Sequence, residues 1–201
     1  MQDDQELVVL VQRGHKEAYT RIVDKYKGKI YAYLYRMIGQ QQDAQDMAQD
    51  VFLKAYCHIH QYKPKHSFSS WLYRIAANHC IDELRKRKKS PRKNQNETTL
   101  VDKQTPEYIL LEKERKQILQ SHLLALDESY RTVLMLRHHE HFSYKEIGVI
   151  LEIPVTTVQM RLHRAHKKLR ESLLASVEGG GFYDLCEIET VPSLHERSTL
   201  S

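Results

Sequence analysis

Five residues with chemically useful side chains recur three or four positions apart in one stretch of the chain, which places them on one face of a helix. They are Trp71, Arg74, Asn78, Asp82 and Arg85. Cations bind phosphates, while aromatic rings and amides bind unstacked bases, so this set suits recognition of an unpaired nucleic-acid strand. A solvated helix face is the alternative that this stretch alone leaves open.

The helix that must position this face has an apolar stripe and a basic end. The stripe consists of Leu72, Ile75, Ala76, Cys80 and Leu84 and predicts one buried side. Seven of the nine residues from 85 to 93 are Lys or Arg, and such a run binds phosphates. The predicted strand-binding set therefore also includes Phe68 at the start of the helix and Arg87 and Lys88 in the basic run.

An acidic and amide-rich face precedes this helix. The side chains that form it are Asp43, Asp46, Gln49 and Asp50, opposite an apolar stripe that includes Ala44, Met47, Val51 and Phe52. Acids at a helix start complement the helix dipole, which accounts for the first two acids better than for Asp50. An exposed acidic patch beside apolar residues can instead dock a partner protein.

The chain is predicted to be all-α, with two small helical domains joined by a flexible linker. It has 201 residues, of which only seven are Gly and five are Pro, a composition typical of helical proteins. Residues 90–107 are polar, have a Pro near each end and lack apolar periodicity, which predicts a linker. The predicted domains are 1–89 and 108–177, and residues 178–201 are predicted to form an acidic, disordered tail.

The second domain is predicted to contain a helix-turn-helix. Ser143 and Glu146 form the S-x-x-E signature of a capping box at the start of a short helix. Pro154 is compatible with the first turn of a longer helix, whose exposed side carries Thr156, Thr157, Gln159, Arg161, Arg164 and Lys167. Amide and guanidinium groups near the start of such a helix reach base edges in the major groove. A helical hairpin with a solvated basic face is the less favoured alternative.

Charge and targeting signals fit a nucleic-acid partner inside the cell. The net charge is +5, although residues 178–201 contain five acids and one base, so positive charge is concentrated in the two domains. The three cysteines have no zinc-ribbon or disulfide spacing. The N-terminus has acids where a secretion signal has bases, and no apolar run is long enough to span a membrane, so we predict a cytoplasmic protein.

The sequence motifs do not support a metal site or an enzymatic activity. Two histidine groups, His58, His60 and His66, and His138, His139 and His141, lack nearby Cys at zinc-finger spacing. The nucleotide-binding, nucleophile-elbow and zinc-protease signatures are absent from the sequence. We therefore predict no catalytic residue, no metal, no cofactor and no small-molecule substrate.

Several motifs, in order, resemble those of the extracytoplasmic-function group of bacterial sigma-70 family RNA polymerase sigma factors. The segment 43–56 (DAQDMAQDVFLKAY) resembles region 2.2, the segment 68–89 (FSSWLYRIAANHCIDELRKRKK) resembles regions 2.3 and 2.4, and the segment 144–170 resembles the region 4 helix-turn-helix. Glu152 departs from the pattern, because such turns often have Gly there, and it implies strain if its φ is positive.

The resemblance implies a function for each segment. Region 2.2 would dock on the β′ coiled coil of core RNA polymerase, through Gln49, Asp50 and Phe52 among others. Regions 2.3 and 2.4 would melt and read the −10 element, with Asn78 and the loop before Ser67 holding a flipped base. Region 4 would bind the −35 element and the β flap, and an anti-sigma factor, often membrane-anchored in this group, would be the inhibitor.

A stand-alone helix-turn-helix regulator that binds an operator as a dimer is the alternative function. The acidic face around Asp50 and the aromatic residues around Trp71 favour the sigma factor, because a protein that binds only duplex DNA needs neither feature.

Overall fold

The computed structural model describes residues 3–89 and 107–177 of the chain. The elements in this part of the chain are helical: α1 Asp4–Gln12, α2 Lys16–Ile38, α3 Gln41–His58, the short 3₁₀ helix η1 Ile59–Gln61, α4 Phe68–Lys89, α5 Glu107–Ala125, α6 Glu128–Leu134, the π-helix η2 Met135–His139, α7 Tyr144–Leu151 and α8 Val155–Val177. The prediction of an all-α chain is confirmed for the described residues. The linker predicted over 90–107 lies almost wholly outside these residues, since α5 begins at Glu107, and the tail over 178–201 lies outside them too.

Local sequence signals set the ends of several helices. Gly14 has φ +95° between α1 and α2, and Gly39 has φ +82° directly after α2, conformations that Gly adopts without a side-chain clash. Ser67 precedes α4 and accepts a hydrogen bond from the backbone N–H of Ser70 at 3.2 Å, as an N-cap residue does. Gly28 lies inside the continuous helix α2.

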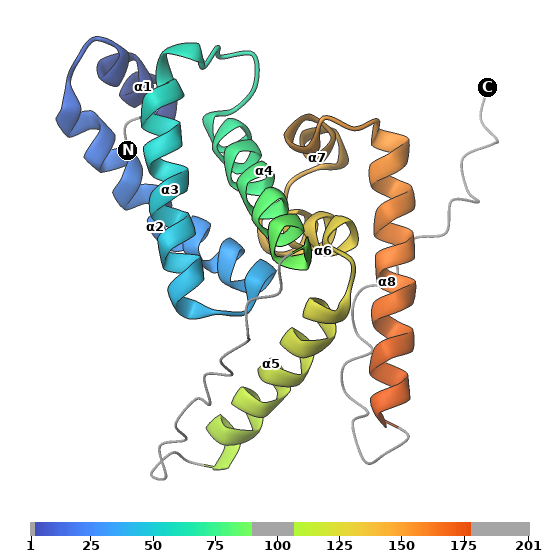
Figure 1. Cartoon of the computed structure of the whole chain (residues 1–201). Helices are drawn as coiled ribbons and strands as arrows, with labels where there is room; N and C mark the ends of the chain where they lie inside the picture. The colour runs from blue at the N-terminus through green and yellow to red at the C-terminus, as the bar shows by residue number, and fades with distance from the viewer. Residues whose placement is uncertain (1–2, 90–106, 178–201) are drawn as a thin grey trace, which may run out of the picture.

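The N-terminal domain is a bundle of α1 to α4, in which α2 contacts the other three helices (Figure 1). Its core contains the predicted stripes of α3 and α4, with Ala44, Val51, Leu72, Ala76 and Cys80 fully buried. The apolar periodicity of this half of the chain thus predicted its packing.

The C-terminal domain packs α8 against α5, α6 and α7. The predicted capping box is present, because Ser143 accepts from the N–H of Glu146 and the Glu146 carboxylate accepts from the N–H of Ser143. The turn after α7 has Glu152 in the left-handed region at φ 54°, as the departure from Gly suggested. The segment before the helix-turn-helix is formed by α6 followed by η2.

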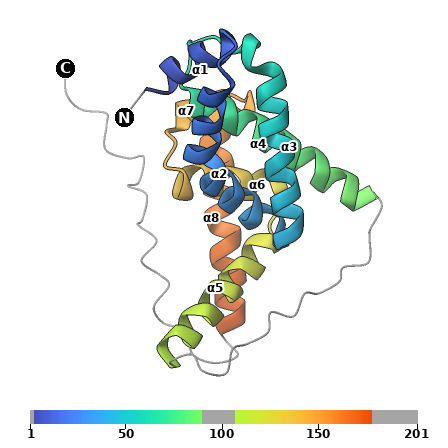
Figure 2. The same cartoon turned by 90° about the vertical axis from the view of Figure 1, so that its left-hand side faces the viewer.

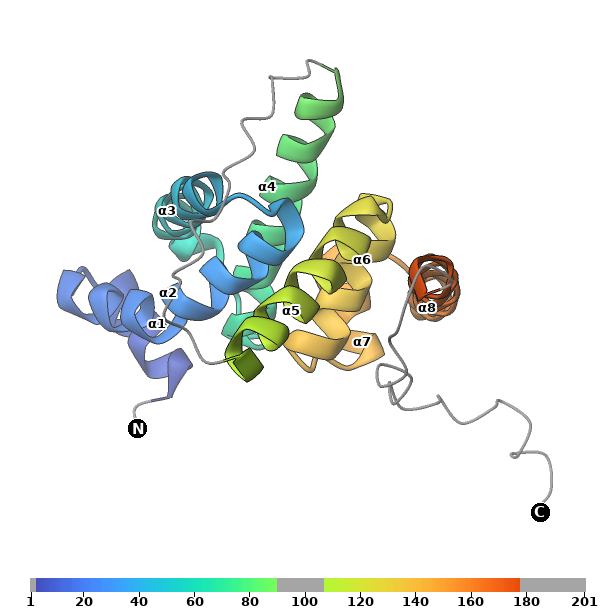
Figure 3. The same cartoon turned by 90° about the horizontal axis from the view of Figure 1, so that it is seen from below.

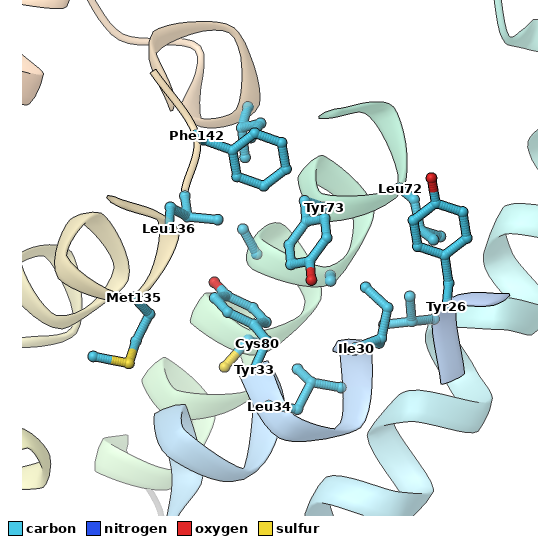
Figure 4. Close-up of a cluster of buried hydrophobic side chains, with 14 of the residues drawn as sticks. Tyr26, Ile30, Tyr33, Leu34, Leu72, Tyr73, Cys80, Met135, Leu136 and Phe142 are labelled. Carbon is cyan, nitrogen blue, oxygen red and sulfur yellow. The ribbon is translucent and has the colours of Figure 1, made fainter. Parts of the chain in front are cut away.

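The two domains are packed side by side through α5, α6, η2 and α7, while α8 lies on the far side of the C-terminal domain from α1 to α4 (Figures 1 and 3). A second view shows α4 next to α6 and α7 (Figure 2). Apolar and aromatic side chains from both domains form one cluster (Figure 4), to which Tyr33, Tyr73, Met135, Leu136 and Phe142 contribute. The rings of Tyr73 and Phe142 meet edge to face at 5.1 Å, a favoured geometry for aromatic pairs.

Arg131 on α6 ties the two domains together by binding the C-terminal ends of two helices. Its buried guanidinium donates hydrogen bonds to the carbonyl of Met37 in α2, and to those of Leu124 and Leu126 at 2.7 and 2.8 Å. Carbonyls in the last turn of a helix lack intrahelical donors and attract cations. Burial lowers the pKa of Arg131, yet guanidinium groups stay charged in proteins.

Candidate nucleic-acid interface

The predicted strand-binding face of α4 divides into an open part and a covered part. Asn78, Asp82 and Arg85 are exposed, and none of them forms a hydrogen bond or ion pair with another described residue. Trp71 and Arg74 are half-buried, and the Arg74 guanidinium is 3.2 Å from the Glu152 carboxylate of the C-terminal domain. The five predicted residues therefore share one helix face, although only the last three are freely accessible.

A hollow of about 290 Å³ adjoins the covered part of this face. Its lining combines two aromatic rings, several cations and one apolar residue from α7: Gln61, Tyr62, Lys63, Lys65, His66, Ser70, Trp71, Arg74 and Val149. A ring beside cations suits an unstacked base and its phosphate. The loop before Ser67, expected to hold a flipped base, thus supplies half of the hollow, while Val149 closes it from the other domain.

The burial of Phe68 removes this residue from the predicted strand-binding set. Its side chain is only 1% exposed and packs against the rings of Tyr26 and Tyr62 at 5.9 and 5.6 Å. An aromatic residue at a helix start that is buried on this scale stabilises the core. Trp71 lies beside it at 5.5 Å and, like Tyr62, lines the hollow.

The basic end of α4 is partly neutralised by acids. Arg87 pairs with Asp43 of α3 at 2.6 Å and lies 3.8 Å from Glu83, so it joins α4 to α3 as well as carrying charge. The exposed Lys88 donates to the Glu128 carboxylate of α6, and this contact lowers the pKa of Glu128. Both predicted phosphate-binding residues therefore have acidic partners in the structure.

The predicted docking face lies on the outer side of α3, with one correction. Asp46, Gln49 and Asp50 are exposed, whereas Phe52 is only 8% exposed and its ring belongs to the core. The neighbouring Leu53 is 65% exposed. An apolar residue off the buried stripe, beside exposed acids, was the sequence signal for a docking residue that the prediction missed.

Asp50 has a contact on the same surface with α4. The Nε2 atom of His79 is 3.3 Å from the Asp50 carboxylate, and its Nδ1 atom is 2.7 Å from the Nζ atom of Lys54. The three side chains link α3 to α4 at the edge of the docking face. The exposed carboxylate of Asp50 keeps acceptor capacity for a partner.

The predicted duplex-reading residues lie on the outward side of α8. Thr156, Gln159 and Arg164 are exposed, as is Lys167, while Thr157 and Arg161 are half-buried. Opposite them, Val158, Leu162, Ala165 and Leu169 are buried, as the periodicity predicted. Lys167 is 3.9 Å from Glu171 on the same helix, and the other five form no side-chain hydrogen bond or ion pair with a described residue.

Histidines form a pair where η2 meets α8. The Nε2 atoms of His138 and His166 are 2.8 Å apart, with the two rings nearly perpendicular. Burial, followed by neighbouring cations, lowers the pKa of His138, and burial also lowers the pKa of His166. Within the described residues, His, Cys, Asp and Glu form no group of three that could hold a metal ion.

Sequence comparisons match both halves of the chain to known proteins. Residues 22–90 match the family model for Sigma-70 region 2, and residues 116–169 match that for Sigma-70, region 4. The ECF RNA polymerase sigma factor SigW of Bacillus subtilis is 38% identical over 173 residues, covering 81% of this chain and 92% of the relative. The RNA polymerase sigma-H factor of Pseudomonas aeruginosa is 34% identical, covering 86% and 94%. The chain belongs to the extracytoplasmic-function group of the sigma-70 family.

Solved structures show the fold of this sigma factor. The structure described as CnrH in complex with the cytosolic domain of CnrY has a TM-score of 0.64 at 26% identity, covering 86% of this chain and 97% of that one. The sigma factor RpoE of Bartonella quintana, in complex with the anti-sigma factor NepR, has a TM-score of 0.62 at 21% identity, which shows the fold alone.

Each half of the sigma factor corresponds to a named region of the family, region 2 or region 4. The region 2 match extends from α2 through α4, and the region 4 match covers most of the segment from α5 to α8. This protein is therefore a promoter-recognising RNA polymerase sigma factor, and the prediction from its motifs is confirmed. The alternative of a stand-alone regulator is not needed, because region 2 and region 4 occur together. None of the described helices is long and apolar enough to cross a membrane.

Proposed function

We propose that the sigma factor divides promoter recognition among three helices. The outer face of α3 docks on the β′ coiled coil of core polymerase, the open face of α4 binds the unpaired −10 strand, and the outward face of α8 reads the −35 duplex. The observation that carries the proposal is the exposure of Asn78, Asp82 and Arg85 on α4, on a helix whose apolar stripe is buried.

The chemistry of each face supports its role. On α4, an amide, a carboxylate and a guanidinium group can bond the edges of unstacked bases, and opening the duplex costs a few kcal/mol per base that such contacts must offset. On α8, Gln159 and Arg161 lie near the helix start, where side chains reach base edges in the major groove. Core polymerase fixes the distance between α4 and α8. The free energies of two weak binding events then add, because the second event occurs at a high effective concentration.

The proposed partners follow from the family. Core polymerase would contact α3 through Asp46, Gln49, Asp50 and Leu53, with Asp43 at its edge, and region 4 would meet the β flap. The solved structure of CnrH includes the cytosolic domain of CnrY, which supports a protein partner for this chain too, and the family makes an anti-sigma factor, possibly membrane-anchored, the proposed partner. We place its action in the cytoplasm, as an initiation factor without enzymatic activity, cofactor or small-molecule substrate.

The direct test is run-off transcription with core polymerase on a library of upstream DNA fragments. We expect discrete start sites that depend on the sigma factor, and their absence on every fragment would refute the proposal. Asp50→Arg should abolish core binding, measured by size-exclusion chromatography, without loss of helical circular dichroism. Asp24→Arg, at an exposed acid of α2 that pairs with Lys27 at 2.7 Å, is the matched control and should bind normally.

A further inference from the structure

His79 on α4 lies between the strand-binding face and the docking face of region 2. It directly follows Asn78, which is exposed on the strand-binding face, and directly precedes Cys80, which is fully buried in the core. Its side chain is 13% exposed and reaches across to α3, where it meets Asp50 of the docking face and Lys54 one turn farther along. A residue of α4 therefore contacts a side chain to which we assign polymerase docking.

The two contacts of the ring assign its tautomer. The ammonium group of Lys54 has donors only, so at 2.7 Å from Nδ1 it donates a hydrogen bond and Nδ1 accepts. The proton of the neutral ring is then on Nε2, which lies 3.3 Å from the Asp50 carboxylate and donates to it. The partner of one ring nitrogen decides where the proton of the ring sits. Lys54 thus makes His79 a neutral donor directed at Asp50.

The Asp50 carboxylate is oriented from a second helix, unlike that of Asp46. Asp46 accepts a hydrogen bond from Gln42 of its own helix at 3.1 Å, whereas the donor to Asp50 belongs to α4. The Asp50 side chain is nevertheless 56% exposed, so it can still accept from a partner. A planar guanidinium group binds a carboxylate best when the two groups are aligned. A side chain that is held in its bound orientation loses less entropy when the complex forms.

We propose that His79 is a positioning residue for docking, which orients the Asp50 carboxylate toward a cationic group, such as a guanidinium, on core polymerase. The inference rests on the proposed docking role of Asp50 and extends it to a residue on another helix. His79 acts through Asp50, and its neighbour Asn78 remains available to the promoter strand.

Protonation of His79 disrupts this arrangement. A proton on Nδ1 removes the acceptor of Lys54 and places two positive groups 2.7 Å apart. The imidazolium also neutralises Asp50, which the partner needs as an anion. Asp50 and Lys54 are the charged groups of α3 that face the ring, while Asp82 and Glu83 lie one turn farther along α4; in the described part of the chain, no charged side chain of α2, α6 or α7 forms a hydrogen bond or ion pair with His79. Affinity for core polymerase should therefore fall on acidification through the range in which histidines gain charge.

The test compares His79→Leu and His79→Gln in the full chain. Leu removes both hydrogen bonds, whereas the Gln amide can accept from Lys54 and donate to Asp50 without gaining charge. Competition with a dye-labelled wild-type chain for limiting core polymerase gives relative affinities. We expect His79→Leu to bind about fivefold more weakly and His79→Gln to bind like the wild type at pH 7.5. His60→Leu, at an exposed histidine of η1, is the matched control and should bind normally.

The pH profile separates positioning from packing. The affinity of His79→Gln relative to the wild type should rise between pH 7.5 and pH 6.0, because only the wild type gains a charge at this position. Equal affinities of His79→Leu and the wild type, or equal losses in the Leu and Gln variants, would overturn the proposal. Helical circular dichroism verifies that each variant is folded.

A double-mutant cycle distinguishes failure of this inference from failure of the docking role. In an Asp50→Ala background, His79→Leu should cause no further loss of core affinity, since the group that it positions is absent. A loss of the same size in both backgrounds would contradict action through Asp50. If Asp50→Ala alone binds core polymerase as the wild type does, the docking role of Asp50 fails as well. A defective Asp50→Ala variant beside a normal His79→Leu variant would overturn the positioning role alone.

Discussion

The two helices that we assign to promoter recognition differ in how much of their working surface is free. On α4, Arg74 and Lys88 are paired with carboxylates of region 4. On α8, Gln159, Arg161 and Arg164 form no side-chain hydrogen bond or ion pair with the described residues, and the helix packs against α5, α6 and α7 of its own domain. The difference indicates that, among the described residues, the outward face of α8 is free of side-chain partners at its centre, whereas the α4 face is free only around Asn78, Asp82 and Arg85 and is paired with region 4 toward its ends.

This difference agrees with the order in which the two DNA ligands, the −35 duplex and the unpaired −10 strand, become available for binding. A −35 element is read as duplex from the major groove, whereas an unpaired strand exists only after melting. Duplex binding by α8 can therefore precede strand binding by α4.

Arg131→Met should have the largest effect on stability, because it removes the guanidinium that binds three carbonyls at the junction of the domains. We expect a loss of about 3 kcal/mol in the free energy of unfolding, measured by urea denaturation. Arg164→Met, at an exposed site on α8, is the matched control and should change it by less than about 0.5 kcal/mol. Similar losses in the two variants would contradict the role of Arg131 at the junction.

Arg161→Ala and Asn78→Ala should distinguish the function of α8 from that of α4. Arg161→Ala should weaken binding to a −35 duplex by about 1–3 kcal/mol if the residue contacts a base, both in the free chain and in holoenzyme. Asn78→Ala should leave duplex binding unchanged and reduce promoter opening in holoenzyme, measured by permanganate reactivity. A uniform loss across all duplex sequences would assign Arg161 to phosphate contact instead.

Acidification should destabilise region 4 before region 2. The pKa values of His138, His139 and His166 lie below the usual 6.5, chiefly because of burial. The unfolded chain therefore binds more protons than the folded chain between those values and 6.5, and stability falls as the pH drops through this window. Arg36, Arg137, His141 and His163 face the three rings and add repulsion.

The measurement is chemical denaturation of the wild type and of His166→Gln between pH 7.5 and pH 5.5. A Gln side chain can keep a hydrogen bond with His138 but cannot gain charge, so the variant should lose less stability over this range. An identical pH dependence of the two proteins would show that the histidine pair does not control it.

Lys88→Met should produce the smallest change. The hydrogen bond from Lys88 is the main reason that the pKa of Glu128 is lowered, so the substitution should return this pKa toward 4.5. Carbon-detected NMR titration of the carboxyl group measures the shift. Because the pair lies near the surface, the change in overall stability should stay within about 1 kcal/mol.

The sequence predicted helices, caps and most exposed functional residues, because these depend on neighbours along the chain. The breaks at Gly14 and Gly39, the capping box at Ser143 and the left-handed turn at Glu152 all follow from local chemistry. Helical periodicity also placed Asn78 and Arg85 away from the core.

What could not be predicted depends on contacts between distant segments. Tyr73 belongs to neither of the two expected faces of α4 and is buried by Phe142, which lies in the other domain. Phe68 was predicted to bind because nothing in the local sequence distinguishes a core ring at a helix start from an exposed one, whereas the apolar stripe of α3 already indicated that Phe52 is buried. The ion pairs of Arg74 with Glu152 and of Lys88 with Glu128 could not be predicted for the same reason.

The most direct test of the account is energy transfer between the two regions, before and after core polymerase is added. One dye is placed on the exposed Cys57 of α3 and the other on a cysteine substituted for the exposed Ser176 of α8, in a Cys186→Ser background. We predict one high-transfer population for the free chain and a lower-transfer population for the holoenzyme, since we propose that core polymerase fixes the separation between α4 and α8. Transfer that stays unchanged when a transcriptionally active holoenzyme forms would contradict the account.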